Sequence, residues 1–189
     1  MRFNCDSQSA ESWQIRAESA VEMLIANDIS LINNINPIKI ADFGCGNERL
    51  KSVLTAKLGN QFDYYGYDLQ PQLESTYKIN LESEMPSLNF DVVFCLGLLE
   101  YIGDLDNLLA KISEISNFYL ISYVVSDSGA YSPTDISKKV WLHHYSCQEL
   151  EIKFKKNYLI QKKFKLTNEG KTGLWLLQNH SFTKTYNIQ

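Results

Sequence analysis

The sequence predicts an α/β protein built on a doubly wound sheet of seven strands, mostly parallel, with an antiparallel last strand. Amphipathic helical patterns alternate with short apolar runs, which is the rhythm of strand and helix units around a parallel sheet. The last two apolar runs are joined by a short turn, as in an antiparallel pair. The 189 residues are 44% hydrophobic and 21% charged, a composition that suits one hydrophobic core. A chain of this length is too short for two ordinary domains.

Each predicted strand is a short apolar run bounded by turn residues, and each predicted helix carries an apolar stripe. The first helix has Trp13 and Ala17 on its stripe and Arg16 largely off it. Ser146 and Glu149 form a capping-box pattern that opens the last helix. Little chain separates the second strand from the third, so a crossover helix there must be very short or absent. The predicted helices span residues 9–26, 49–58, 105–115 and 146–156, and the strands 38–43, 62–67, 76–81, 90–96, 118–125, 158–166 and 173–178.

Charge is divided unevenly along the chain. Residues 1–137 carry 19 acidic and 8 basic side chains, a net charge of −11, whereas residues 138–189 carry 3 and 10, a net charge of +7. The overall net charge of −4 makes nucleic acid an unexpected partner, because phosphate neutralisation normally requires a basic excess. The C-terminal lysines alternate with apolar residues, which favours a solvated outer face over a surface that steers an anionic acceptor.

The cysteines and the apolar runs bear on location. Four widely spaced cysteines, with no CxxC pair and no hydrophobic leader, indicate free thiols rather than disulfides or a zinc site. The longest nearly uncharged runs, Val92–Leu99 and Phe118–Val125, are too short to cross a bilayer. We therefore expect a cytoplasmic protein with no membrane span and no metal.

The most informative segment is Asp42-Phe43-Gly44-Cys45-Gly46, at the end of the first strand. Glycines there let the backbone approach a ligand at the carboxyl edge of a parallel sheet. Asp68 ends the next strand, where a carboxylate can accept both hydroxyl hydrogens of a ribose. A dinucleotide motif would require glycine in place of Arg49, and the GK[ST] of a P-loop is missing. The alternative to a ligand-binding turn is a tight strand-to-helix turn in which the glycines serve only the backbone conformation.

These segments resemble the motifs of class I S-adenosylmethionine-dependent methyltransferases. Ile40–Gly46 is similar to the first motif of that superfamily, Tyr67-Asp68 to its ribose acid, and Phe90–Tyr101 to its fourth-strand motif. The resemblance spans residues 38–125. It implies a Rossmann-like fold, S-adenosylmethionine as cofactor and S-adenosylhomocysteine as product.

The resemblance also implies a role for individual residues. The family usually has a third glycine where this chain has Glu48, so Glu48 either contacts the amino group of the cofactor or marks a damaged site. An Asn at a strand end is equally explained as a turn residue. The implied contacts are Asp42, Gly44, Cys45 and Gly46 for the methionine part, Asp68 for the ribose, Leu69, Asn80 and Leu81 for the adenine, and Cys95, Leu96 and Gly97 below the sulfonium.

Methyl transfer to a hydroxyl mainly requires alignment of the acceptor and removal of a proton. The candidate bases are His143 and His144, whose alternative role is that of surface or capping histidines. Glu100, Tyr101 and Tyr123 are further candidates for the acceptor pocket.

We expect a single methyltransferase domain, with an N-terminal helical segment at 1–37, a cofactor-binding core at 38–125, and a lid-like segment and C-terminal strands at 126–189. The segments Leu96–Leu105 and Leu120–Tyr123 are similar to methyltransferases of glycan and polysaccharide biosynthesis. The expected acceptor is therefore a small molecule, a hydroxyl of a sugar or glycan precursor. Another metabolite, RNA, and a module that binds the cofactor without catalysis are the alternatives, and the sequence leaves the oligomeric state open.

Overall fold

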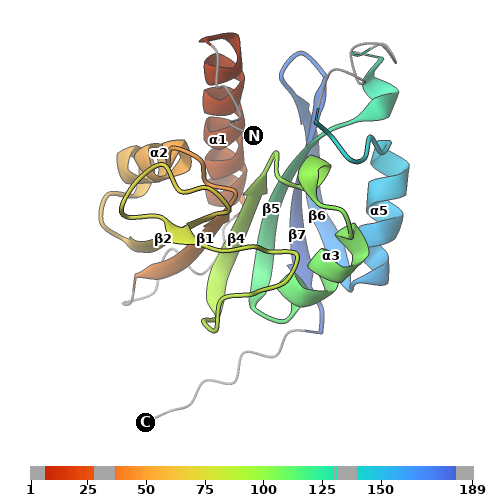
Figure 1. The fold of residues 1–189 in the computed structure, drawn as a ribbon. Helices are drawn as coiled ribbons and strands as arrows, with labels where there is room; N and C mark the ends of the chain where they lie inside the picture. The colour runs from red at the N-terminus through yellow and green to blue at the C-terminus, as the bar shows by residue number, and fades with distance from the viewer. Residues whose placement is uncertain (1–6, 28–36, 130, 132–139, 182–189) are drawn as a thin grey trace.

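A computed structural model describes residues 7–27, 37–129, 131 and 140–181 and contains a seven-stranded sheet in the order β3-β2-β1-β4-β5-β7-β6 (Figure 1). Of these strands β7 runs antiparallel to both of its neighbours, while the others run in one direction. The predicted fold class is thus confirmed. The strands are β1 (Ile38–Phe43), β2 (Phe62–Asp68), β3 (Tyr77–Lys78), β4 (Phe90–Leu96), β5 (Ser116–Val124), β6 (Leu159–Thr167) and β7 (Thr172–Asn179).

Helices cover both faces of the sheet, with α1 and α2 on one side and α3 and α5 on the other (Figure 1). The capping box that opens α5 is present, since Glu149 N–H donates to Ser146 Oγ and Ser146 N–H donates to Glu149 Oε2. The helices are α1 (Ser7–Ala26), α2 (Arg49–Leu58), α3 (Leu105–Ser113) and α5 (Cys147–Lys156), with short 3-10 turns η2 (Leu99–Tyr101) and η3 (Ser126–Ser128).

The central strand β4 shows why the sheet is buried on both sides. Its side chains alternate, so that Val92 and Phe94 join the core under α1 and α2, whereas Val93 and Cys95 join the core under α3. All four are at most 1% exposed. A strand covered on both faces reads as a continuous apolar run, which is why its bounds were predicted correctly.

The chain between β2 and β4 contains no helix. Residues 69–76 and 79–89 form turns and bends, as the short separation of the second and third strands predicted for the first of these segments. The third strand is shorter than the predicted 76–81, because the chain turns at Asn80, whose carbonyl accepts the N–H groups of Ser83 and Glu84. One face of β1 and β2 is therefore covered by loops.

The N-terminal helix α1 differs from its prediction at one residue. Arg16 is 8% exposed, although the helical pattern placed it largely off the apolar stripe. It lies three residues after Trp13, on the same face, and both side chains lie against Gly97 at the end of β4. Glycine at position 97 leaves the room that this buried arginine occupies.

The C-terminal strands form the far edge of the sheet. Lys162 and Lys163 of β6 are exposed, as expected for a solvated outer face. Most of the predicted lid-like segment 126–137 lies outside the described residues, namely residues 130 and 132–137. Cys5 also lies outside them. In the described part of the chain, no helix has the length and apolar character needed to span a membrane.

Candidate functional site

The turn after β1 leaves its backbone open to the carboxyl edge of the sheet. Gly44 and Gly46 have φ values of 73° and 54°, a left-handed conformation that glycine adopts without strain. Gly44 N–H donates to the carbonyl of Tyr67, which ties the turn to β2. A Cβ on Gly46 would meet no atom within 4 Å, so there is open space beside this backbone.

Asp68 ends β2 and joins it to the glycine turn. Its Oδ2 accepts the N–H of Gly46 at 3.0 Å, and its Oδ1 accepts the N–H of Gln70 at 2.8 Å. A carboxylate oxygen has more than one lone pair, so both oxygens can still accept hydroxyl hydrogens. The structure thus brings the predicted ribose acid and the predicted glycine turn together.

Asp42 is buried directly beneath this turn and is only 4% exposed. Its Oδ2 accepts the hydroxyl of Tyr64 at 2.7 Å. Burial raises the pKa of Asp42 to about 7, and the carboxylates of Glu48 and Asp68 act in the same direction, while the Tyr64 hydrogen bond opposes them. Three neighbouring carboxyl groups favour a cation at this edge of the sheet.

Glu48 has a left-handed backbone, with φ of 57°, and a side chain that is 4% exposed. Its Oε1 accepts the hydroxyls of Ser75 at 2.9 Å and Thr76 at 2.8 Å, and its Oε2 pairs with Lys51 Nζ at 2.9 Å. Burial by itself would raise the pKa of Glu48, but these hydrogen bonds outweigh it and lower the pKa. Both carboxylate oxygens therefore have partners within the protein.

The predicted adenine contacts lie in different environments. Leu69 is 55% exposed, whereas Leu81 is 6% exposed and belongs to the core. Asn80 Oδ1 accepts the N–H of Glu82 at 3.2 Å, as a turn residue does. Leu69 and Asn80 are thus exposed, whereas Leu81 is not accessible to a ligand.

The predicted residues at the end of β4 are tightly packed. Cys95 and Leu96 are buried, and burial raises the pKa of the Cys95 thiol, which keeps it protonated and inert. Gly97 has φ of 69°, and a Cβ there would lie 2.5 Å from Arg16 Nη1 and 2.6 Å from Trp13 Cη2. Gly97 thus lets α1 reach the carboxyl edge of the sheet.

Arg16 was not among the predicted site residues. Its guanidinium lies 4.7 Å from the centre of the Trp13 ring, and its Nε has no hydrogen-bond partner. Burial lowers the pKa of Arg16, and the charge of Glu100 opposes this. The spacing of three residues between Trp13 and Arg16 was the available sequence signal, because it puts both on one helix face.

Glu100 lies on η2 and is 1% exposed. Its Oε1 accepts the N–H of Val124 at 2.8 Å, while its Oε2 is buried without a hydrogen-bond partner. Burial raises the pKa of Glu100, and the charge of Arg16 acts against this. The ends of β4 and β5 therefore hold two buried groups of opposite charge, each with an unsatisfied atom.

The two predicted bases have different surroundings. His143 Nε2 lies 3.0 Å from the carbonyl of Gly103, so this nitrogen is engaged. The His144 ring lies 5.5 Å from that of Trp141, and its Nε2 is buried without a hydrogen-bond partner. Burial lowers the pKa of His144, which favours the neutral imidazole.

The segment that carries these histidines is held against the end of β4. Leu142 N–H donates to the carbonyl of Glu100 at 2.8 Å, and Trp141 Nε1–H donates to Tyr101 Oη at 3.2 Å. Tyr123 Oη accepts the N–H of Tyr145 at 3.1 Å. Aromatic rings thus border the ends of β4 and β5.

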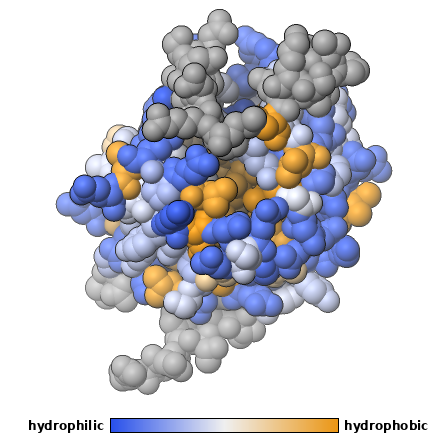
Figure 2. All heavy atoms as spheres, viewed as in Figure 1, coloured by the Kyte–Doolittle hydropathy of each residue, from blue (hydrophilic) through white to orange (hydrophobic). Residues whose placement is uncertain are grey.

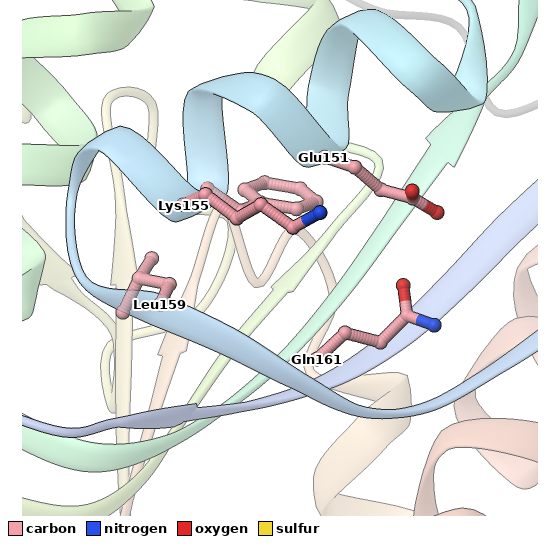
Figure 3. A pocket seen from close by; sticks show the side chains of 5 residues that line it. Glu151, Lys155, Leu159 and Gln161 are labelled. Carbon is pink, nitrogen blue, oxygen red and sulfur yellow. The ribbon is translucent and has the colours of Figure 1, made fainter.

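One pocket of the protein lies away from this site. A pocket of about 120 Å³ lies between α5 and β6, with Glu151 and Lys155 on the helix and Leu159 and Gln161 on the strand (Figure 3). Leu159 begins β6, which runs in the same direction as β1 and β4. This pocket therefore lies at the edge where these strands begin, opposite the edge that contains their carboxyl ends and the candidate site. Figure 2 shows instead an apolar patch near the centre of the face, framed by hydrophilic residues.

Within the described residues, no group of His, Cys, Asp and Glu side chains is arranged to hold a metal ion.

The candidate site consists of two adjoining parts. One contains the carboxyl groups and glycines at the ends of β1 and β2, which we call the acidic half. The other contains Arg16, Glu100 and the rings at the ends of β4 and β5, which we call the aromatic half.

Several solved methyltransferase structures are similar to this chain in fold. Among solved structures, a chain of the complex between the Haloferax volcanii Trm112 methyltransferase activator and the putative methyltransferase has a TM-score of 0.66 at 11% identity, covering 92% of this chain and 96% of that one. The magnesium protoporphyrin IX methyltransferase of Synechocystis, solved with bound S-adenosylhomocysteine, has a TM-score of 0.67 at 13% identity, covering 95% and 90%. The mitomycin 7-O-methyltransferase MmcR has a TM-score of 0.68 at 14% identity, covering 92% and 55%.

At these identities the structural similarity concerns the fold. A search of the curated proteins gave no match. The family model described as "Methyltransferase domain" matches residues 19–165, which is most of the chain. The protein belongs to this methyltransferase domain family.

Proposed function

We propose that the protein transfers the methyl group of S-adenosylmethionine to a hydroxyl of a small molecule, namely a sugar or glycan precursor. One observation carries the cofactor part of the proposal. In a chain of the methyltransferase domain family, the Asp68 carboxylate accepts the N–H of Gly46, so the ribose acid lies directly beside the glycine turn.

The residues of the acidic half fit this cofactor. S-adenosylmethionine has two ribose hydroxyls, which suit a carboxylate with free lone pairs, and a positively charged sulfur, which suits neighbouring carboxyl groups. Asp68 would accept the hydroxyls, and the open backbone beside Gly46 would receive the methionine part. When bound, the cofactor supplies an electrophilic methyl group on a sulfur that leaves as a neutral thioether.

The aromatic half would bind the acceptor. Flat rings such as those of Trp141 and Tyr101 offer apolar faces, and the neighbouring polar atoms fix orientation. Arg16 and Glu100 each retain an atom without a partner, which can be satisfied by polar groups of a bound molecule. These features support an acceptor with both a flat face and hydroxyl groups.

We assign the general base to His144. The base must be neutral and must have a nitrogen free to take the hydroxyl proton of the acceptor. His144 Nε2 has no partner, and burial lowers the pKa of this residue. His143 Nε2–H donates to the Gly103 carbonyl, and its ring stacks on that of Tyr145 at 5.1 Å, which gives this residue a role in holding the segment. His144 would accept the proton, and His143 would hold the segment in place.

A small molecule also suits the charge of the protein better than RNA. The net charge is −4, and the site is bordered by carboxyl groups that repel phosphates. We propose the cytoplasm as the location. The free thiols of Cys45, Cys95 and Cys147 support it.

The proposal is tested by calorimetric titration with S-adenosylmethionine and S-adenosylhomocysteine, followed by transfer of a labelled methyl group to sugars, nucleotide-linked sugars, other metabolites and RNA. We expect both cofactor forms to bind and a sugar hydroxyl to be methylated. Binding without transfer to any acceptor would indicate a non-catalytic module. No binding of either form below millimolar concentration would overturn the cofactor assignment.

A further inference from the structure

The residue that departs from the family motif, Glu48, is engaged with a loop distant in sequence. Its Oε1 accepts two hydroxyl hydrogens, from Ser75 and Thr76, in the segment that joins β2 to β3. The hydroxyl of Thr76 is also contacted by the thiol of Cys45, which belongs to the glycine turn. The turn after β1 and the loop after β2 are thus joined by buried side chains.

Loop 69–76 has two attachments to the glycine turn. At its beginning, Asp68 accepts the N–H of Gly46, and at its end, Ser75 and Thr76 donate to Glu48. No helix is present between β2 and β3 to hold this loop by packing. Its conformation therefore depends on hydrogen bonds, namely these two attachments and the bonds within the loop from Gln70 N–H to Asp68 and from Thr76 N–H to the Leu73 carbonyl.

The surroundings of Glu48 are shaped to admit its carboxylate. Gly66 lies opposite on β2, and a Cβ there would lie 3.1 Å from Glu48 Oε1. A side chain at position 66 would crowd the carboxylate, together with the Tyr64 ring and the Cys45 thiol. The backbone of Glu48 has φ of 57°, which is unfavourable for a residue other than glycine, so the buried charge-assisted hydrogen bonds must offset this cost.

We propose that Glu48 is a positioning residue that holds loop 69–76 in the shape that receives the adenosine half of S-adenosylmethionine. The inference rests on the proposed function and replaces a direct contact between Glu48 and the amino group of the cofactor. Leu69, which follows Asp68 and is 55% exposed, and Leu73, which is 44% exposed, are the apolar side chains that this loop presents. The carboxylate acts through Ser75 and Thr76, not on the cofactor.

The test compares two ligands that share the adenosine half. S-adenosylhomocysteine carries the amino acid end, and methylthioadenosine lacks it. We expect Glu48→Gly to weaken both ligands by the same factor, roughly tenfold or more, because hydrogen bonds to a charged group are lost. A loss of affinity confined to S-adenosylhomocysteine would show a contact with the amino group and overturn the proposal. Unchanged affinity for both ligands would also overturn it.

Matched variants separate the two carboxylate oxygens. Lys51→Ala removes the partner of Oε2 and leaves Ser75 and Thr76 on Oε1, so it should lower both affinities far less than Glu48→Gly does. The double variant Ser75→Ala/Thr76→Val removes the partners of Oε1 and should reproduce Glu48→Gly. Adding Glu48→Gly to the double variant should then cause no further loss, whereas additive losses would contradict a shared mechanism.

Folding and function are kept apart by two further measurements. Glycine suits the left-handed backbone at position 48, so Glu48→Gly should fold, which circular dichroism checks. If it does not fold, the Ser75→Ala/Thr76→Val variant carries the test. A wild-type protein that binds neither ligand would refute the proposed function, whereas wild-type binding with unchanged Glu48→Gly binding refutes the positioning role alone.

Discussion

The acidic half and the aromatic half of the site satisfy their polar groups differently. In the acidic half, Asp42, Glu48 and Asp68 each accept hydrogen bonds from the protein itself. In the aromatic half, Glu100 Oε2 and His144 Nε2 are buried without hydrogen-bond partners. Buried polar atoms normally have partners, so a polar group of a bound acceptor or a water molecule would stabilise these two atoms.

This difference suggests a division of labour. A site whose groups are already hydrogen-bonded is preorganised, which reduces the ordering cost of binding a ligand of constant shape. A site with unsatisfied buried atoms discriminates between acceptors. An acceptor that cannot hydrogen-bond to these atoms does not offset the free-energy cost of their desolvation, and so it binds more weakly. Under the proposed function, the acidic half would bind the cofactor and the aromatic half would select the acceptor.

The largest expected effect separates catalysis from cofactor binding. His144→Ala should lower kcat by about 100- to 10,000-fold, the usual contribution of a general base, with unchanged affinity for S-adenosylhomocysteine. His143→Ala is the matched control and should reduce kcat far less, because that ring is assigned to holding the segment through the Gly103 carbonyl and the Tyr145 ring. A larger loss from His143→Ala would reverse the assignment.

The next effect concerns the acidic half alone. Asp68→Ala should lower the affinity for S-adenosylhomocysteine by roughly 100-fold, since it removes the proposed acceptor for the ribose hydroxyls and the hydrogen bonds from the N–H groups of Gly46 and Gln70. Asp68→Asn keeps one carbonyl acceptor and should fall between that variant and wild type. Calorimetry at constant ionic strength measures both, and equal affinity of Asp68→Ala and wild type would remove Asp68 from the site.

The buried charges of the aromatic half should matter for stability. Glu100→Ala leaves the N–H of Val124 without its acceptor and Arg16 without its counter-charge, so the free energy of unfolding should fall by about 3 kcal/mol. Glu100→Gln keeps an acceptor for Val124 and should cost less. Urea denaturation compares the two variants, and equal losses would mean that charge, not the hydrogen bond, is what counts.

The smallest expected effect is a pH dependence in the acidic half. The folded protein raises the pKa of Asp42 to about 7, so its contribution to stability is fully present below the ordinary carboxyl pKa and is lost as pH rises through about 7. A bound cation favours the ionised carboxylate. Affinity for S-adenosylmethionine should therefore rise between pH 6 and pH 8 by about tenfold at most.

Two controls identify the group that titrates. The neutral thioether of S-adenosylhomocysteine should bind with a shallower pH dependence than the sulfonium. Asp42→Asn can keep the hydrogen bond from Tyr64 and should flatten the pH profile of the sulfonium form. Identical profiles for both ligands would mean that Asp42 does not sense the sulfonium.

The sequence predicted the parts of the fold that are encoded locally. The bounds of β1, α2 and β4 agree with the predictions, because apolar runs and turn residues define them within a short stretch. The places of the glycine turn and of Asp68 at the ends of β1 and β2 were also predicted, since each strand end has a distinctive residue. The third strand was predicted too long, because the turn at Asn80 depends on its own hydrogen bonds and not on hydropathy.

The parts of the site that were missed depend on contacts between distant segments. Arg16 is polar and was placed off the apolar stripe, and its burial follows from the space left by Gly97. The partners of Glu48 come from the loop after β2, which no local pattern links to the glycine turn. Hydropathy periodicity assigns faces to elements, but it does not show which distant residue makes room for a buried charge.

The contact between α1 and Gly97 has a consequence for the order of folding. It joins the first helix of the chain to the fourth strand of the sheet, so a long loop must close before it forms. Contacts of this kind carry a high entropic cost and form slowly. We expect the central strands to assemble first and α1 to dock last, so that newly made chains acquire the completed aromatic half only at the end of folding.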